Sequence, residues 1–241
     1  MNQDIVPELD QIGLAKTPGE LWRTMRRYFR GRGFEGLGYF LANRHARSPV
    51  RGFALIHRGF SREVSRRYID EGWGTKDPGP AFALAQGCPV RWSDSFRSMD
   101  MDEEQAHFLA AMREVNLGDG YSLPVYGPRG RHGALAIGNA RRADALNKAP
   151  LDEMHLIAQA AHMRLCQLLP DTILLDKPLS ARELEILEWV ARGKSNGVIA
   201  DILDLSAGTV DTYLRRIFDK LDVSDRTSAA VRGVGMGLIA A

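Results

Sequence analysis

The C-terminal part of the chain, from Leu179 to Ile239, contains the sequence patterns of several short helices in succession. These patterns predict a compact helical domain. Ser180 and Glu183 have the spacing of a capping box, in which both side chains satisfy backbone N–H groups at a helix start. Gly193 is suited to end this helix. Apolar residues recur between them with helical spacing, at Leu184, Leu187, Val190 and Ala191.

Two more helices are predicted after this one. The second runs from about Ser195 to Leu203, and Asp204-Leu205-Ser206 interrupts it. Ser206 can cap the third helix. Apolar side chains are predicted to face the core at Val198, Ile199, Ile202 and Leu203 in the second helix, and at Val210, Leu214, Ile217 and Leu221 in the third. A connection this short is typical of a helix-turn-helix.

The opposite face of the third helix carries Asp211, Thr212, Arg215 and Arg216. Short polar side chains near a helix N-terminus, followed by Arg side chains, suit the reading of bases and phosphates in the DNA major groove. A solvated face in a small helical bundle is the alternative, and the short turn favours DNA binding. We expect base contacts from Thr212, Arg215 and Arg216. Phosphate contacts are expected from Lys194, Ser206, Thr209 and Lys220.

This region resembles the LuxR-type DNA-binding domain. The matching residues are Leu179-Ser180-Ala181-Arg182-Glu183, Trp189, Gly193-Lys194, Ile199-Ala200, Leu203, Ser206, Thr209-Val210, Ile217, Lys220-Leu221, Val223, Arg226 and Gly237-Leu238-Ile239. Val198, Tyr213 and Arg216 depart from the pattern, which commonly has Glu, His and Asn there. The first departure removes a capping box from the second helix. The last alters the groove face, so the preferred DNA sequence cannot be transferred from relatives.

Composition limits the other possibilities. The 241 residues suffice for one large and one small domain, and the net charge is +2. From Pro178 onward eight Lys or Arg stand against nine Asp or Glu, so the DNA prediction rests on where the Arg residues lie. Cys88 and Cys166 lack metal-ligand spacing, and we expect no metal site and no disulfide. No leader and no long apolar run is present, so a cytoplasmic protein without a membrane partner is expected.

The region before the helix-turn-helix mixes helices with strands in hairpins, which indicates an α+β architecture. Helices are predicted to begin at Thr17, Ser61, Gly79 and about Met101, and a last helix at Pro150 or Leu151 that ends near Leu168. Strands are predicted at Phe34 to Leu41, Gly52 to Arg58, Pro89 to Trp92, Gly120 to Tyr126 and His132 to Asn139. The predicted domains are residues 1–168 and 178–241, joined by a linker over 169–177.

The first domain contains Tyr68, Asp77-Pro78, Trp92 and Gly120, together with Gly133-Ala134-Leu135. In their spacing these residues resemble the ligand-binding domain of LuxR-type quorum-sensing regulators. This resemblance implies an α-β-α sandwich with an antiparallel sheet, in which an acyl-homoserine lactone lies between the sheet and one helical layer.

Such a ligand has an amide and a lactone, and leaving either unpaired in a cavity costs about 1 to 3 kcal/mol per group. The resemblance implies that Asp77 accepts from the amide N–H, that Tyr68 donates to the amide carbonyl and that Trp92 walls the head group. Val64 replaces the lactone-reading Trp of the family, and Phe60 stands where Tyr is common. Phe40, Phe108 and Ala136 complete the predicted lining.

Our hypothesis is that the chain keeps the amide-reading half of the site but prefers another head group or binds lactones weakly. The alternative is that Tyr68, Asp77 and Trp92 only hold the core together. No catalytic motif such as G-x-S-x-G and no phosphate-binding Gly loop occurs, so neither an enzyme nor a cofactor other than a signal molecule is expected.

The expected function is that of a dimeric, ligand-responsive transcription factor that binds a two-fold symmetric DNA site. The family resemblance implies dimerisation through the first domain and the last helix, from about Arg226 to Met236. One alternative is an orphan regulator with a non-lactone ligand or no ligand. Two others are a phosphorylation receiver in place of the ligand domain, and a partner that holds other regulators in inactive heterodimers. The receiver is disfavoured because the first region is too long and its Asp residues lack the receiver arrangement.

Overall fold

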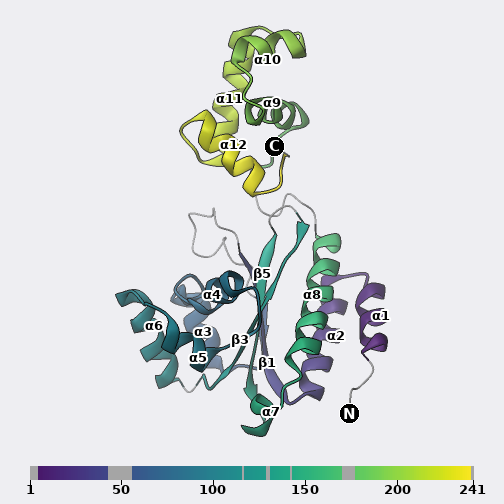
Figure 1. Ribbon diagram of the computed structural model, residues 1–241, viewed down its shortest axis with the longest axis vertical. Helices are drawn as coiled ribbons and strands as arrows, with labels where there is room; N and C mark the ends of the chain where they lie inside the picture. Colours follow the sequence, from purple (N-terminus) through teal and green to yellow (C-terminus); the bar gives the residue numbers. More distant parts are fainter. Residues whose placement is uncertain are drawn as a thin grey trace. The chain divides into compact units, whose positions relative to one another are not determined.

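The computed structural model describes residues 5–42, 56–115, 117–128, 131–141, 143–169 and 177–239. The chain divides into two compact units, and the division along the chain falls between Leu169 and Pro170. Most of the predicted linker, residues 170–176, lies outside the described residues. Each unit is described by itself below (Figure 1).

A five-stranded antiparallel sheet forms the centre of the first unit, with the strand order β2-β1-β5-β4-β3. The strands are β1 (Phe34–Ala42), β2 (Ile56–Arg58), β3 (Val90–Arg91), β4 (Gly120–Val125) and β5 (His132–Ala140). The predicted hairpin is therefore confirmed as β4 and β5, in register at Leu123 and Leu135. The prediction that strand two begins at Gly52 concerns residues 52–55, which lie outside the described part of the chain.

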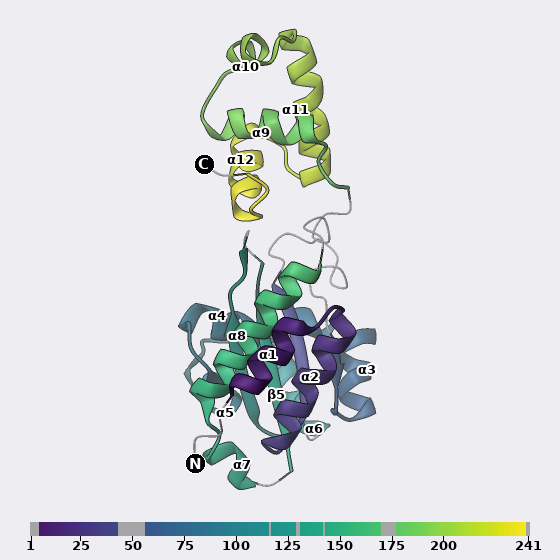
Figure 2. The same cartoon turned by 90° about the vertical axis from the view of Figure 1, so that its right-hand side faces the viewer.

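Helices cover both faces of this sheet (Figures 1 and 2). One face carries α2 (Pro18–Gly31) and α8 (Leu151–Leu168), with α1 (Val6–Leu14) packed beside them. On the other face lie α3 (Arg62–Asp70), α4 (Gly79–Gln86), α5 (Trp92–Ser98) and α6 (Glu103–Glu114). A short 3-10 turn, Trp73–Thr75, follows α3, and α7 (Ala143–Asn147) precedes α8. The predicted α+β sandwich is confirmed.

Local capping explains where several of these helices begin. The Thr17 side chain accepts a hydrogen bond from the Glu20 N–H at 3.2 Å, and the Ser61 side chain accepts one from the Val64 N–H at 3.2 Å. Such bonds satisfy N–H groups that have no partner inside the helix. Asp102 and Gln105 form a capping box that starts α6, one residue after the predicted Met101.

The second unit contains four helices: α9 (Ala181–Ala191), α10 (Asn196–Leu203), α11 (Ala207–Leu221) and α12 (Arg226–Gly235). The capping box of Ser180 and Glu183 is present, and Gly193 has a positive φ of 74° after α9. Fully buried Ile186, Leu187, Ile199, Val210, Ile217 and Leu221 form its core. The helix-turn-helix prediction is thus confirmed in structure.

Two predicted core assignments in this unit are wrong. Val198 and Ile202 are 42% and 43% exposed, because α10 packs through Ile199 and Ala200 and turns the i, i+4 pair outward. In α9 the completely buried position is Ile186, whereas Leu184 is only partly buried. Among the described helices of the chain, none is both long and apolar enough to cross a membrane.

Candidate functional site

An apolar cavity lies in the first unit between the sheet and the layer formed by α3, α5 and α6. All eight side chains predicted to bind a ligand line it: Phe40, Phe60, Val64, Tyr68, Asp77, Trp92, Phe108 and Ala136. Six further lining residues were not predicted as site residues: Gly38, Ser65, Phe96, Leu109, Met112 and Leu117. The cavity itself has a volume of about 40 Å³, and all the space between the lining atoms, with the open solvent at its mouth included, is about 550 Å³. Ligand binding by these residues remains a prediction.

Glycines of the sheet make room for two aromatic rings at the cavity floor. Gly138 on β5 pairs with Gly36 on β1 and with Gly120 on β4. A Cβ at Gly36 would lie 2.5 Å from the Phe60 ring, and one at Gly138 would lie 2.6 Å from the Trp92 ring. The row of glycines therefore lets both rings lie directly against the sheet.

Tyr68 and Asp77 form the polar centre of the cavity. The Tyr68 hydroxyl donates to Asp77 Oδ2 at 2.7 Å, and the Gly79 N–H donates to Asp77 Oδ1 at 2.8 Å. Asp77 stands at the start of α4 because Pro78 disfavours helical geometry in the residue before it. Burial raises the pKa of Asp77, although both hydrogen bonds oppose this rise. Burial, followed by the charge of Asp77, raises the pKa of Tyr68.

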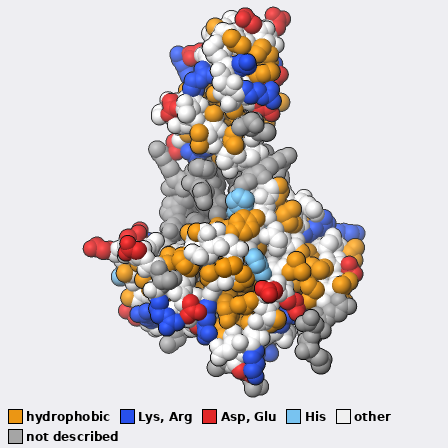
Figure 3. Space-filling view, in the orientation of Figure 1, with side chains coloured by type: hydrophobic (Ala, Val, Ile, Leu, Met, Phe, Trp, Pro, Cys, Tyr) orange, Lys and Arg blue, Asp and Glu red, His pale blue; other side chains and the backbone are white. Residues whose placement is uncertain are grey.

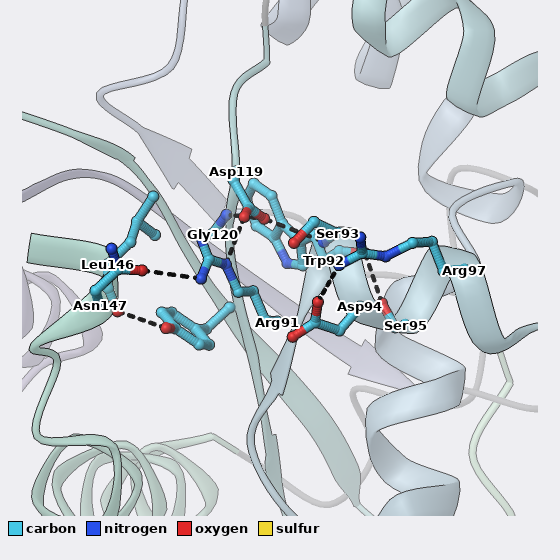
Figure 4. A network of polar contacts seen from close by, with 11 residues as sticks. Arg91, Trp92, Ser93, Asp94, Ser95, Arg97, Asp119, Gly120, Leu146 and Asn147 are labelled. Carbon is cyan, nitrogen blue, oxygen red and sulfur yellow. Dashed lines mark hydrogen bonds and ion pairs between the residues drawn. The ribbon is translucent and has the colours of Figure 1, made fainter. Parts of the chain in front are cut away.

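Hydrogen bonds fix the Trp92 side chain and also the residues on both sides of it in the chain (Figure 4). Its indole N–H donates to Ser122 Oγ at 3.0 Å. The Asp119 carboxylate accepts from Arg91 Nε at 2.6 Å, from the Ser93 N–H at 3.1 Å and from the Gly120 N–H at 2.9 Å. Burial alone would raise the pKa of Asp119, but these donors lower it. Asp119 therefore fixes the first turn of α5 to the beginning of β4.

Sequence reasoning missed this supporting set for identifiable reasons. Asp119 and Ser122 act on residues far away in the chain, and no local pattern shows that. Leu109 and Met112 share a helix face with Phe108, and this periodicity is the signal that could have added them. Phe96 was missed because α5 was not predicted beyond the extended piece ending at Trp92.

The helix-turn-helix of the second unit presents the predicted polar face. Asp204, with a φ of 53°, ends α10, and Ser206 Oγ caps α11 by accepting from the Thr209 N–H at 3.0 Å. Thr212, Arg215 and Arg216 are exposed. Arg215 forms an ion pair with Asp211 at 2.8 Å, and their side chains are 79% and 48% exposed. The Arg216 guanidinium lies over the Tyr213 ring, 5.7 Å from its centroid.

Lys220, for which a phosphate contact is predicted, also makes contacts inside the second unit. Its Nζ donates to Glu183 Oε2 at 2.7 Å and to the Pro178 carbonyl at 3.2 Å. Glu183 Oε2 also accepts from the Ser180 N–H at 2.6 Å. Burial would raise the pKa of Glu183, but Lys220 and Ser180 lower it. Lys220 thus joins the end of α11 to the start of α9, and we leave it out of the proposed DNA contacts.

Basic and acidic side chains are mixed on the visible surface of the second unit (Figure 3). Lys194 is exposed, and its carbonyl accepts from Arg226 Nη2 at 2.5 Å. Among the residues that the structure describes, no three His, Cys, Asp or Glu side chains gather into a group able to hold a metal ion.

Comparison with known protein families identifies both units. Residues 17–165 match the model of the autoinducer binding domain, and residues 177–232 match that of the bacterial regulatory proteins of the luxR family. The chain belongs to the LuxR family of quorum-sensing transcriptional regulators. Within this family it is 31% identical over 212 residues to the quorum-sensing regulator RhlR of Pseudomonas aeruginosa, covering 86% of this chain and 84% of that one.

A further family member, the quorum sensing-dependent transcriptional regulator RpaR of Rhodopseudomonas palustris, is 29% identical over 201 residues, covering 83% of this chain and 82% of RpaR. The fold agrees with two solved structures of SdiA, the first of which is a crystal structure of the Escherichia coli protein. One has a TM-score of 0.69 at 21% identity and covers 98% of this chain and 97% of its own. Another, SdiA in complex with octanoyl-rac-glycerol, has a TM-score of 0.64 at 20% identity. It covers 99% of this chain and 98% of its own.

Proposed function

We propose that this protein is a dimeric transcriptional regulator whose DNA binding depends on a small acylated amide signal held in the cavity of the first unit. The observation that carries the proposal is the Tyr68–Asp77 pair. A carboxylate in an apolar cavity is costly unless it is hydrogen-bonded, and this one faces space that a ligand with an N–H group could occupy.

The cavity lining suits a ligand with an apolar chain. Phe40, Phe108, Leu109, Met112 and Leu117 provide aromatic and aliphatic surface, and the polar groups are few. Such pockets, mostly apolar with a small number of oriented polar groups, are typical of small-molecule sites. The names of the relatives support a quorum-sensing signal. The SdiA complex supports the view that this fold accommodates an eight-carbon acyl chain.

On DNA, we propose that α11 enters the major groove. Thr212, Arg215 and Arg216 are placed for base contacts, with Asp211 orienting Arg215 through their ion pair. Ser206 and Thr209 lie at the start of α11, and Lys194 lies just before α10. Contacts from such residues to phosphates would position the domain on DNA. Arg215→Ala should relax sequence specificity at one base position in each half-site.

Dimerisation is supported by exposed apolar side chains on two helices. Val231 and Val234 on α12 are 69% and 40% exposed, and Leu156 and Met163 on α8 are 51% and 38% exposed. Their i, i+3 and i, i+7 spacings place each pair on one helix face. Isolated exposed apolar residues need no explanation, but pairs on one face suit a partner helix. A second copy of the chain is the partner that a two-fold DNA site requires.

The test is a DNA selection from random fragments, followed by footprinting with and without a panel of acyl amides. We expect a two-fold symmetric site, bound more tightly when a ligand is present. Asp77→Asn and Tyr68→Phe should abolish the ligand response while leaving the footprint at high protein concentration unchanged. Footprints without sequence preference would contradict the regulator, and an unchanged ligand response in both variants would contradict the pocket. If the protein binds no DNA by itself and a relative loses its DNA binding when the two are mixed, the heterodimer alternative is favoured.

A further inference from the structure

The polar groups of the cavity can be matched one by one to the groups of a ligand. Four lining residues carry hydrogen-bonding side chains: Ser65, Tyr68, Asp77 and Trp92. Two of them already donate their hydrogen to the protein. The Trp92 indole N–H donates to Ser122 Oγ at 3.0 Å, and the Ser65 hydroxyl donates to the Ser61 carbonyl at 3.0 Å.

The remaining pair, Tyr68 and Asp77, can exchange partners with one amide. The Tyr68 hydroxyl donates to Asp77 Oδ2 in the structure. When a secondary amide enters, its N–H can take this place on the carboxylate, and the released Tyr68 hydroxyl can donate to the amide carbonyl. Each group then keeps a partner, so that no buried polar group is left unpaired. The amide N–H replaces the Tyr68 hydroxyl as the donor to Asp77, and the amide carbonyl replaces Asp77 as the acceptor from Tyr68. One secondary amide therefore satisfies both side chains.

A second carbonyl would find no comparable donor among the described lining residues. Val64 is 4% exposed and apolar, and Phe60 lies with its ring against the glycines of the sheet. The other lining residues are Gly38, Phe40, Phe96, Phe108, Leu109, Met112, Leu117 and Ala136, and their side chains carry no N–H or O–H group. A lactone carbonyl in this cavity would therefore lose its bonds to water without replacement.

We propose that the cavity selects a secondary amide with apolar groups on both sides, namely an acyl chain on the carbonyl and a cycloalkyl or aryl group on the nitrogen, over a homoserine lactone. This inference rests on the proposed function, because it assumes that the cavity holds the signal. It concerns the head group alone and holds for any acyl length that fits.

Calorimetric titration of the full chain with matched compounds tests the proposal. The probes are N-octanoyl-homoserine lactone, N-octanoylcyclopentylamine, which lacks the second carbonyl, and cyclopentyl octanoate, which lacks the N–H as well. We expect the cyclopentylamide to bind about tenfold more tightly than the lactone and than the ester, as the loss of one buried hydrogen bond predicts. If no octanoyl compound binds, the series is repeated with acyl chains of four to twelve carbons.

A pair of variants separates hydrogen bonding from simple hydrophobicity. Val64→Trp adds an indole N–H to the cavity wall, whereas Val64→Phe adds aromatic bulk alone. The preference for the cyclopentylamide should shrink about tenfold in Val64→Trp and persist in Val64→Phe. Equal or tighter binding of the lactone by the wild type, or the same shrinkage in both variants, would overturn the inference and leave the proposed function intact. Failure of every compound at every acyl length would remove the proposed ligand response and the inference together.

Discussion

His162, on α8, shows how burial determines the behaviour of a single residue. It is 1% exposed. Its Nδ1 lies 2.8 Å from the Tyr39 hydroxyl and its Nε2 lies 2.7 Å from the Arg131 carbonyl. A carbonyl only accepts, so Nε2 carries the hydrogen and the neutral ring accepts from Tyr39. Burial, the largest cause, lowers the pKa of His162 to about 4, although the Arg131 carbonyl favours the protonated ring.

This lowered pKa makes the free energy of unfolding depend on pH. Above the pKa of an unfolded His, about 6.5, both states are neutral. Below it the unfolded chain binds a proton and the folded chain does not until about pH 4, so stability falls as pH falls through this window. At about 1.4 kcal/mol per pH unit, His162 should account for about 2 kcal/mol between pH 6.5 and 5.

Urea unfolding of the wild type and of His162→Gln at pH 7 and pH 5 measures this contribution. Glutamine keeps a donor and an acceptor but does not titrate in this range. The variant should be less stable at pH 7 and should lose about 2 kcal/mol less on going to pH 5. Parallel losses in the two proteins would show that His162 does not carry the dependence.

The glycine row offers a second prediction at this scale, because a methyl group there has no room. In Gly138→Ala the new Cβ would meet the rigid Trp92 ring at 2.6 Å, and overpacking of this kind costs about 1 to 3 kcal/mol. Gly197 is a matched control, since it lies in helix α10 and a Cβ there has no neighbour within 4 Å. Gly197→Ala should stabilise by about 0.5 to 1 kcal/mol. Thermal unfolding of both variants measures the contrast, and equal shifts would contradict the close contact with Trp92.

At the scale of elements, the Lys220–Glu183 pair is a polar contact between α11 and α9, which also share the hydrophobic core. The side chains are 24% and 3% exposed. Removal of one partner from a pair this buried leaves a charge without compensation, at a cost of about 3 kcal/mol. Lys220→Met should therefore destabilise the second unit by about that amount, whereas Lys194→Met should leave its stability unchanged.

The same two variants should also differ in the salt dependence of DNA binding, and here Lys194→Met should show the larger effect. Lys194 is exposed near the helix-turn-helix. Its loss should reduce the slope of log affinity against log salt by about one unit, which is the effect of one lost phosphate contact. Lys220→Met should retain the slope at temperatures where it is folded. Salt titrations of gel shifts, paired with melting curves, measure both properties. A reduced slope in Lys220→Met would restore this residue to the DNA contacts.

Elements with local signals could be predicted from sequence, and elements with distant causes could not. The caps at Thr17, Ser61, Ser180 and Ser206 lie beside the helices that they start, and all four helices were predicted. Helix α5 was missed because its first turn is capped by Asp119, which lies just before β4 and far from α5 in the chain. Val198 and Ile202 were misassigned because periodicity shows that a helix has an apolar face but not which neighbours cover it.

The residues that line the candidate cavity could be predicted from the sequence, but the hydrogen bonds and contacts that these residues make could not. Its eight predicted residues came from a spacing that resembles a family, and the structure brings all eight together. The supporting contacts did not follow from that spacing. Ser122 accepts the hydrogen bond of the Trp92 indole N–H, and the row of glycines leaves room for the Phe60 ring. Both arrangements depend on the pairing of strands that are far apart in the chain. Those contacts decide which hydrogen bonds remain for a ligand.

For the whole molecule, the proposed function as a dimeric regulator requires that two chains associate. Val231 is 69% exposed and belongs to a helix that has its own buried face at Ala229 and Gly233. Because its side chain makes little contribution to the core, Val231→Asp should fold normally. A carboxylate on a helix that packs against its own copy would be desolvated opposite a like charge, which is strongly unfavourable.

Val231→Asp should therefore weaken dimerisation and lower the affinity for a two-fold DNA site at least tenfold, while binding of a single half-site stays unchanged. Val231→Leu is the control, because it keeps the face apolar and the helix propensity favourable. Analytical ultracentrifugation measures the association, and gel shifts on full and half sites measure its consequence for DNA. If Val231→Asp remains a dimer with full affinity, α12 does not form the interface and the exposed face of α8 becomes the surface on which two chains must meet.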